Sequence, residues 1–447
     1  MSSAAGSTSR RQGAGRSDRG KPLTLLRDSV FVVGASLAVR AAFIWFKGPA
    51  SYSADLAAWR DAGELLAAGR NPYLLTTFFS WPPVWIQIVF LLQSIGSRLG
   101  VSLIWIIPIF LIATESVLIV ALLWLLRDLG YGRRRALVLL GIALNPVCVI
   151  LVCQHGNFDV LVALLVLLCV GCLIRFNRFH ESDDWLFACF WLGLGIALKS
   201  VPVLLLPLLL SGSRRLTLRV RCLGAALALG PTIYGLGFLH VFHAAHVRTQ
   251  ILGYRSVSGW FGVTGWLHLI GLDSWIGPYA GVFTSVIVAL SSMLAAAAYL
   301  DRVATPERLV ASASFMLVLV PALGPGYGPQ YFYWFWPLVL VSYALGSVRV
   351  RRWVLGFGLV AAATYIVEYA FAPVLGAFLD MRFPATRNFL FRPGAFRMFT
   401  PVGTPLWLAY LGLLGVLAGQ LREPPSLRRW SDESGSPLGS GTSDLHE

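Results

Sequence analysis

Charged residues are scarce in this sequence. Asp, Glu, Lys and Arg together make up 13% of the 447 residues, hydrophobic residues make up 57%, and the mean hydropathy is +0.70. A soluble globular domain carries about a quarter charged residues and a smaller apolar share. The composition therefore excludes a soluble globular protein and predicts a polytopic membrane protein.

Alternating apolar and polar segments of about ten residues, the pattern of a membrane β-barrel, are also missing from the sequence. The apolar runs are continuous instead, and a helix needs about 20 such residues to cross the hydrocarbon core of a bilayer. We therefore predict an all-α polytopic membrane protein with about twelve transmembrane helices.

Cysteine and histidine offer no metal-binding pattern. The six cysteines lie within or beside apolar segments and form no C-x-x-C pair in a soluble module. Three histidines follow an i, i+3, i+6 spacing, but no carboxylate or cysteine nearby completes a site. We predict that the cysteines are packing residues: Cys148, Cys153, Cys169, Cys172, Cys189 and Cys222. We expect no bound metal at these cysteines or at His240, His243 and His246.

Acidic residues are outnumbered by basic ones, 21 to 36, which gives a net charge of +15. The arginines gather in short clusters next to hydrophobic segments rather than on one soluble face. This placement is a signal of membrane topology and argues against nucleic acid as a partner. The partner that it indicates is the lipid bilayer.

The membrane domain is expected to cover residues 29–421, between disordered cytoplasmic tails at 1–28 and 422–447. The N-terminal tail has no cleavable signal pattern, because the apolar stretch after it is long enough to span. If 84–99 lies along the membrane rather than across it, every basic cluster from Arg127 onward falls on the cytoplasmic side. The predicted spans then lie at about 30–46, 103–126, 136–153, 157–174, 185–199, 201–213, 220–242, 279–300, 308–323, 331–346, 352–371 and 405–421.

A polar island interrupts the apolar region early in the chain. Residues 53–83 read SADLAAWRDAGELLAAGRNPYLLTTFFSWPP, which is far longer than a short connecting loop. They contain Asp55, Asp61 and Glu64, then an N-P-Y turn and a W-P-P break. We predict that the first outer loop, residues 48–102, contains juxtamembrane helices and forms the active-site loop.

The predicted topology brings the other polar loops to the same face of the membrane. These are the H-G-N-F-D turn at 155–159, Lys199, and the loops at about 243–278, 324–330 and 372–405. The cytoplasmic loops are short and rich in arginine. This asymmetry favours a reaction site at the extracytoplasmic face over a pore, which is expected to carry polar residues along its spans.

The order of these motifs resembles the GT-C superfamily of polytopic glycosyltransferases, in particular the polyprenol-phosphate-mannose-dependent glycosyltransferase family 87. The features that carry the resemblance are an acidic residue in the first outer loop (Asp55, in D-x-x-x-W), a G-x-N-P-Y turn and an aromatic-Pro-Pro motif. Asn145-Pro146, the L-K-S-V-P turn at 198–202 and P-Q-Y at 329–331 are further matches. Together they cover the chain from about residue 50 to 340.

The resemblance implies an enzyme that moves a hexose from a polyprenyl-phosphate donor to a hydroxyl of a glycan or glycolipid. Mannose is the hexose that we expect. The reaction is expected on the extracytoplasmic side of the plasma (inner) membrane, with both termini cytoplasmic. No metal or other cofactor is expected, since the lipid-linked sugar is a co-substrate. Arabinosyl, glucosyl and aminosugar transfer are open alternatives within the superfamily.

The implied chemistry asks for a carboxylate. A sugar hydroxyl is a poor nucleophile, so a base must take its proton as the glycosidic bond breaks. Asp55 is the predicted base, and Asp61 is the second candidate. A solvated or helix-capping acid is the alternative interpretation of Asp55.

The implied leaving group, a phosphate, requires positively charged residues nearby. A departing polyprenyl phosphate gains negative charge, which fixed positive groups stabilise. Lys199 interrupts an apolar run and is predicted to bind the donor phosphate, with snorkelling to the interface as the alternative. The other residues predicted to bind the donor phosphate or sugar are His155, Asp159, Arg248, Arg255, Gln330 and Tyr331. Asp159 also suits a helix start, and Tyr331 an aromatic belt. For Arg382, Arg387, Arg392 and Arg397, contact with lipid headgroups is expected.

Two charges lie inside predicted spans. Arg40 and Glu115 are expected to pair, because pairing lowers the cost of both charges in the membrane. A carboxylate at this depth also fits a proton-coupled transporter. A multi-helix transporter or a lipid-linked-sugar flippase, which predicts an inverted repeat, is therefore the alternative function. A non-catalytic scaffold would leave the polar loop at 53–83 unexplained.

Overall fold

The fold is described from a computed structural model, which covers residues 21–47, 54–74, 81–212, 216–238, 262–326, 328–371 and 399–422. All regular structure in these ranges is helical, so the predicted all-α fold class is confirmed. The α-helices are α1 (Lys21–Lys47), α2 (Ala54–Ala67), α3 (Pro83–Leu99), α4 (Leu103–Asp128), α5 (Arg134–Val138), α6 (Pro146–Val149), α7 (Asp159–Phe179), α8 (Ser182–Leu198), α9 (Leu216–Phe238), α11 (Gly262–Leu269), α12 (Ile276–Tyr299), α13 (Pro306–Leu323), α14 (Phe332–Leu345), α15 (Val348–Ile366) and α18 (Phe399–Arg422).

Shorter turns of other helical types connect or extend these helices. The 3₁₀ turns are η1 (Pro72–Leu74), η4 (Val201–Leu210), η5 (Asp273–Trp275) and η6 (Pro329–Tyr331), and the π-helical turns are η2 (Leu139–Ala143), η3 (Ile150–His155) and η7 (Val367–Phe371). A mid-helix π turn is rare and often lies at a functional site.

Among the described residues, seven helices are long and apolar enough to cross a membrane, or eight if the bent segment at 134–155 is one span. The protein is therefore an integral membrane protein. The predicted number of about twelve spans is higher than this count because it included shorter segments. Helix α14 and the turn η4, for example, fall below the length of a regular crossing helix. Helix α3, which we predicted to lie along the membrane, is not among the seven, and α1 starts at Lys21, before the predicted span.

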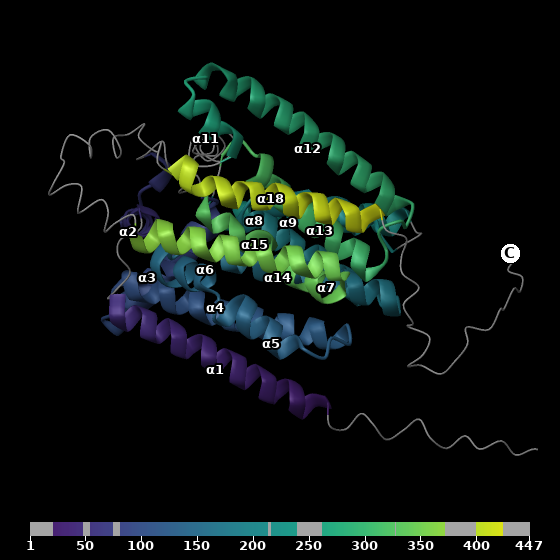
Figure 1. Ribbon diagram of the computed structural model, residues 1–447. Helices are drawn as coiled ribbons and strands as arrows, with labels where there is room; N and C mark the ends of the chain where they lie inside the picture. The colour runs from purple at the N-terminus through teal and green to yellow at the C-terminus, as the bar shows by residue number, and fades with distance from the viewer. Residues whose placement is uncertain are drawn as a thin grey trace, which may run out of the picture.

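The long helices lie side by side in one bundle (Figure 1). Helix α7 packs against α4, α8 and α14 and is mostly buried, whereas α12 lies at an outer edge and exposes apolar side chains along its length. Apolar side chains facing outward are the expected state for a helix in contact with lipid tails.

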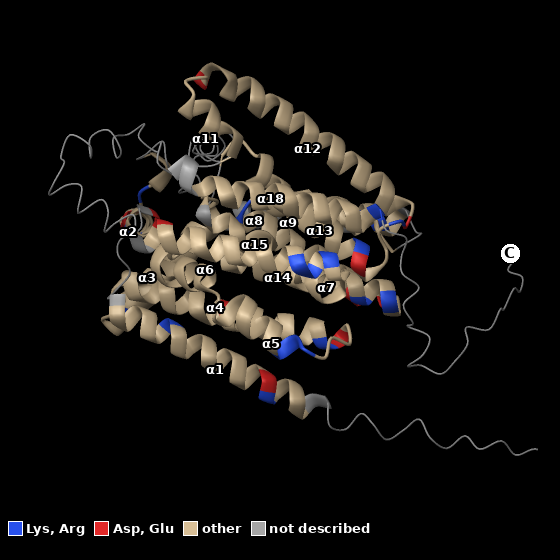
Figure 2. Ribbon diagram, viewed as in Figure 1, with Lys and Arg blue, Asp and Glu red and all other residues tan. Residues whose placement is uncertain are grey.

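Charge separates the two ends of the bundle (Figure 2). Most described Lys and Arg residues lie toward one end, and α2, with its acidic residues, lies at the other. Ion pairs join neighbouring helices at the arginine-rich end: Arg134–Asp28 at 3.2 Å, Arg175–Asp184 at 3.2 Å and Arg219–Asp301 at 3.1 Å.

The segment at 134–155 is bent by 48° where α6 begins. The bend follows from Asn145-Pro146, because proline lacks an N–H and its ring clashes with the preceding turn. The Asn145 side chain accepts the N–H of Val147 at 2.9 Å and so caps the second half of the segment. Both halves contain a π turn, η2 before the bend and η3 after it, and the second ends at His155.

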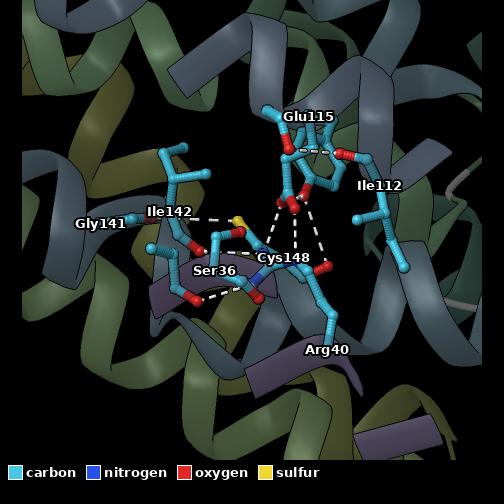
Figure 3. Close-up of polar contacts among 10 residues, drawn as sticks. Ser36, Arg40, Ile112, Glu115, Gly141, Ile142 and Cys148 are labelled. Atoms are coloured by element: carbon cyan, nitrogen blue, oxygen red, sulfur yellow. Dashed lines mark hydrogen bonds and ion pairs between the residues drawn. The ribbon is translucent and has the colours of Figure 1, made fainter. Parts of the chain in front are cut away.

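A buried cluster around Arg40 holds this bent segment (Figure 3). Arg40 and Glu115 are fully buried and form an ion pair, with Nη2 of Arg40 at 2.6 Å from Oε1 of Glu115, so their predicted pairing is confirmed. The guanidinium also donates to the carbonyls of Ala143 at 2.6 Å and Ile142 at 3.2 Å, the last two residues of η2. The hydroxyl of Tyr333 donates to Oε1 of Glu115 at 2.5 Å. The carboxylate that suggested a transporter is thus engaged on two sides.

Candidate functional site

The polar island folds around an aromatic cluster. Trp59 contacts Trp85 and Trp81 edge to face, with ring centroids 4.9 and 5.7 Å apart, and Trp85 stacks on Phe158 at 4.3 Å. Trp59 lies one helical turn after Asp55 on α2, so the two side chains share a face of the helix. The D-x-x-x-W motif therefore anchors the start of α2 to α3 and to the 155–159 turn.

Two hydrogen bonds shape the chain between α2 and α3. The side chain of Asn71 accepts the N–H of Tyr73 at 2.9 Å, which closes a local turn. The hydroxyl of Tyr73 donates to the carbonyl of Trp81 at 2.5 Å. The N-P-Y and W-P-P motifs thus contact each other and tie the chain after α2 to the start of α3.

The turn at 155–159 reverses the chain between η3 and α7. Gly156 has a φ of +67°, a left-handed conformation that glycine adopts without a Cβ penalty. A Cβ at Gly156 would lie 2.9 Å from Cδ1 of Leu56, so the backbone of the turn approaches α2 closely. The side-chain oxygen of Asn157 accepts the N–H of Asp159 at 3.1 Å, which closes a local turn just before α7.

Asp55 faces this turn from the first turn of α2. Its Oδ2 accepts the side-chain N–H of Asn157 at 3.1 Å and lies 3.5 Å from Nε2 of His155. The Asp55 side chain is 24% exposed, so the carboxylate is half-buried and open to a ligand. Residues separated by about a hundred positions thus meet, as the predicted topology requires. The first turn of a helix also favours an acid through its dipole, so the helix-start interpretation describes the position of Asp55 as well.

His155 has a second partner on a distant helix. Its Nδ1 lies 3.0 Å from the hydroxyl of Tyr369, and the two rings meet edge to face with centroids 6.0 Å apart. Tyr369 belongs to η7, the π turn that ends α15. The His155 side chain is 16% exposed and lies between Asp55 and Tyr369.

Lys199 lies beside this group at the end of α8. Its Nζ contacts both carboxylate oxygens of Asp159, at 2.7 and 3.0 Å. Three aromatic rings surround the ammonium group within cation–π range, at 5.3, 5.6 and 4.9 Å for Phe158, Tyr331 and Trp334. Asp159 is fully buried, whereas the Lys199 side chain is 18% exposed.

The structure does not bring every predicted residue to this place. Asp61 is exposed and bonds to Arg60 at 3.1 Å, because six residues on a helix turn it about 120° away from Asp55. Gln330 lies in η6 next to Tyr331, and its Oε1 is buried without a hydrogen bond to the described residues. The predicted residues Arg248 and Arg255 lie outside the described ranges, as do His240, His243, His246, Arg382, Arg387, Arg392 and Arg397, and Cys222 lies in α9 with its side chain not described.

Two residues of the site escaped prediction. Asn157 stands in the H-G-N-F-D motif, where its position between two candidates was the available signal. Tyr369 lies in an apolar run 214 residues from its partner His155, and no feature of the sequence marks it.

The arrangement suits proton removal next to a cation. A carboxylate with one oxygen held by a donor can accept a proton at the other, and the Lys199 ammonium offers positive charge to an anion. No group of three His, Cys, Asp or Glu side chains able to hold a metal occurs within the described part of the chain.

One family model matches the chain. It is described as dolichyl-phosphate-mannose-protein mannosyltransferase, and the match covers residues 82–236, about a third of the chain from the start of α3 to near the end of α9. The match includes the 155–159 turn and Lys199, while Asp55 lies before it and Tyr369 after it. A search of curated proteins finds no match.

Proposed function

We propose that this membrane hexosyltransferase, which carries a polyprenyl-phosphate-mannose mannosyltransferase domain at 82–236, transfers mannose to a hydroxyl of a glycan or glycolipid with Asp55 as the general base. The observation that carries the proposal is the contact of Asp55 with Asn157 and His155, because both partners lie in the matched region. Family 87 is the relationship within the GT-C superfamily that the motifs favour.

The proposed step removes a proton and breaks one bond. The acceptor hydroxyl gives its proton to the carboxylate of Asp55 while its oxygen bonds to the anomeric carbon of mannose. The bond from that carbon to the phosphate oxygen breaks, and its electron pair leaves with the polyprenyl phosphate. The anomeric carbon passes through an oxocarbenium-like state, as in glycoside hydrolysis.

Lys199 is proposed to stabilise the leaving phosphate. The ammonium group is partly exposed and three donors are available to it. Asp159 holds the lysine in place and compensates its charge when no donor is bound, and the phosphate then competes for the same N–H groups. His155 and Tyr331 line the same place and are proposed to contact the donor sugar. Arg248, Arg255 and Gln330 keep their proposed role at the donor.

A membrane domain of twelve crossings, over residues 29–421, is proposed with its site on the extracytoplasmic side. Pairs such as Arg134–Asp28 and Arg175–Asp184 join helices at one end of the bundle, and Asp55, His155 and Lys199 meet at another place. This separation supports a topology in which successive helices cross the membrane in opposite directions. The ten-residue η4 extends about 20 Å because a 3₁₀ helix rises about 2 Å per residue. The arginine-rich end is proposed to face the cytoplasm of a plasma (inner) membrane.

The test replaces the two candidate acids in turn. Asp55→Asn is expected to lower transfer from radiolabelled polyprenyl-phosphate mannose about 10²–10⁴-fold, because an amide cannot take the proton. Asp61→Asn serves as the matched control, since Asp61 is exposed and lies outside the site. Thermal unfolding in detergent checks that both variants fold. Full activity of Asp55→Asn would remove Asp55 as the base.

A further inference from the structure

Both described polar contacts of the Asp55 carboxylate fall on the same oxygen. Asn157 donates to Oδ2 at 3.1 Å, and Nε2 of His155 lies 3.5 Å from Oδ2. Within the described ranges no hydrogen bond or ion pair reaches Oδ1. The half-buried carboxylate therefore has one oxygen held by the protein and one open oxygen.

The far side of the imidazole is held by Tyr369. The hydroxyl of Tyr369 lies 3.0 Å from Nδ1 of His155, and the ring of Tyr369 stacks on Tyr365 one helical turn earlier, with centroids 6.0 Å apart. A neutral imidazole has one N–H and one acceptor nitrogen, and the partner of one nitrogen decides where the proton sits. The state of His155 toward Asp55 thus depends on Tyr369.

We infer that Tyr369 is a positioning residue for Asp55, acting through His155. Its O–H donates to Nδ1 of His155, the imidazole proton stays on Nε2, and this N–H faces Oδ2 of Asp55. The inference rests on the proposed function, in which Asp55 is the general base. It assigns proton uptake to Oδ1.

The chemistry of the three groups fixes this direction. An ionised carboxylate only accepts hydrogen bonds, so its contact with Nε2 favours the tautomer with the proton on that nitrogen, and the contact of Nδ1 with Tyr369 favours the same tautomer. The other nitrogen of a neutral imidazole is then an acceptor, and the phenol O–H is the donor that faces it. The opposite tautomer of His155 would set a nitrogen lone pair against the carboxylate, which is repulsive.

Other charges around the imidazole leave this assignment in place. Asp159 acts on His155, but its carboxylate is bonded to Lys199. Glu368 precedes Tyr369 on η7 and is buried, and its charge acts on the tyrosine rather than through a described hydrogen bond. Of the contacts given above, Nε2 lies next to Asp55 and Nδ1 next to Tyr369.

The assignment has a consequence for the proton in the reaction. Asp55 takes the acceptor proton at Oδ1, while Oδ2 keeps its hydrogen bond from Asn157 and its contact with Nε2 of His155. These contacts hold the carboxylate, so Oδ1 is aimed before the acceptor arrives.

The first measurement reads the tautomer directly and does not depend on activity. In the full-length protein with ¹⁵N-labelled histidine in lipid bilayers, NMR of the imidazole nitrogens is expected to show the proton of His155 on Nε2. The variant His155→Gln assigns the signal among the seven histidines. In Tyr369→Phe the proton is expected to move partly or wholly to Nδ1. A proton on Nδ1 in the unaltered protein, or a tautomer that Tyr369→Phe leaves unchanged, overturns the inference.

The second measurement reads catalysis with polyprenyl-phosphate mannose as donor and a glycolipid extract of the source membrane as acceptor. Tyr369→Phe is expected to lower kcat about 10–100-fold, as for other residues that orient a histidine, and to leave KM for the donor unchanged. Tyr365→Phe, one helical turn earlier, is the control and is expected to keep the original kcat and KM.

A double variant separates positioning from folding. His155→Gln presents a fixed amide and no longer depends on a tautomer, so adding Tyr369→Phe to it is expected to have no further effect on kcat. Independent, multiplying effects would overturn the inference. Loss of transfer in Asp55→Asn together with an unaltered kcat in Tyr369→Phe would reject this inference alone. Full transfer in Asp55→Asn would instead reject the proposed function.

Discussion

Nζ of Lys199 lies between the two carboxylate oxygens of Asp159, at 2.7 and 3.0 Å, although the residues are 40 positions apart. Asp159 is fully buried and Lys199 is not. The lysine therefore has two roles that substitutions can separate: it compensates a buried charge, and it presents a partly exposed cation.

Lys199→Met is expected to destabilise the protein by about 3–5 kcal/mol, because it leaves the Asp159 carboxylate buried and unpaired. The double variant Lys199→Met with Asp159→Asn is expected to regain most of the stability, since the uncompensated charge is gone, but not the transfer of mannose. Thermal unfolding in detergent and the transfer assay measure the two effects. If the double variant regained full transfer, Lys199 would have no role at the donor phosphate.

Gly156→Ala is expected to disrupt the site more than an equally strained glycine elsewhere. Its left-handed φ of +67° costs a side-chain residue about 1–2 kcal/mol, and a Cβ would also press on Leu56, next to Asp55. Gly69→Ala is the matched control, because Gly69 has the same φ and no atom within 4 Å of the added Cβ. We expect both to lower the midpoint of thermal unfolding and Gly156→Ala alone to lower kcat strongly. Equal effects on kcat would mean that the contact with Leu56 does not position Asp55.

Replacing one partner of the Arg40–Glu115 ion pair is expected to destabilise the protein more than replacing both. Glu115→Leu leaves a fully buried guanidinium without its carboxylate, at a cost of about 3–5 kcal/mol. The double variant Arg40→Met with Glu115→Leu is expected to be less destabilised than Glu115→Leu, in thermal unfolding monitored by circular dichroism. Arg60→Met removes an exposed ion pair and is expected to leave the midpoint unchanged. A double variant less stable than Glu115→Leu would show that Arg40 acts mainly through the carbonyls of Ile142 and Ala143.

Asn157→Asp is expected to keep the start of α7 and to impair the base. An aspartate can still accept the N–H of Asp159, so the turn before α7 is kept. It replaces the donor to Asp55 by a carboxylate about 3 Å away, and two like charges at this distance repel when both are ionised. Stability is therefore expected to fall as the pH rises above about 4, where carboxyl groups ionise. Thermal unfolding across pH measures this, and an unchanged pH dependence would contradict the contact between residues 55 and 157.

Membrane spans and their polar ends were predictable because each is a local property of the chain. Continuous apolar runs predicted the helices, and a polar residue at the end of a run marked Asp55, His155, Asp159 and Lys199. The pairing of Arg40 with Glu115 was predictable as well, because two opposite charges inside the membrane need each other.

The count of spans and the outer contacts of the site were not predictable in the same way. A 3₁₀ segment such as η4 covers more distance per residue than an α-helix, so length in residues misjudges it. Tyr369 reaches His155 only because α15 ends in a π turn, and neither hydropathy nor spacing reports such a turn. Asp61 was over-predicted because its sequence neighbourhood resembles that of Asp55, while helix geometry turns it to the opposite side.

The π turns η2 and η3 determine the rotation about the helix axis at which the following residues lie. A π turn holds one residue more than an α-helical turn, and one residue corresponds to about 100° of rotation about the helix axis. If 139–143 wound as a regular α-helix with no residue removed, the extra residue would rotate everything after it by roughly that angle. The imidazole of His155 and the amide of Asn157 would then point away from α2. The orientation of the site thus depends on the helix type of a segment that contributes no side chain to it.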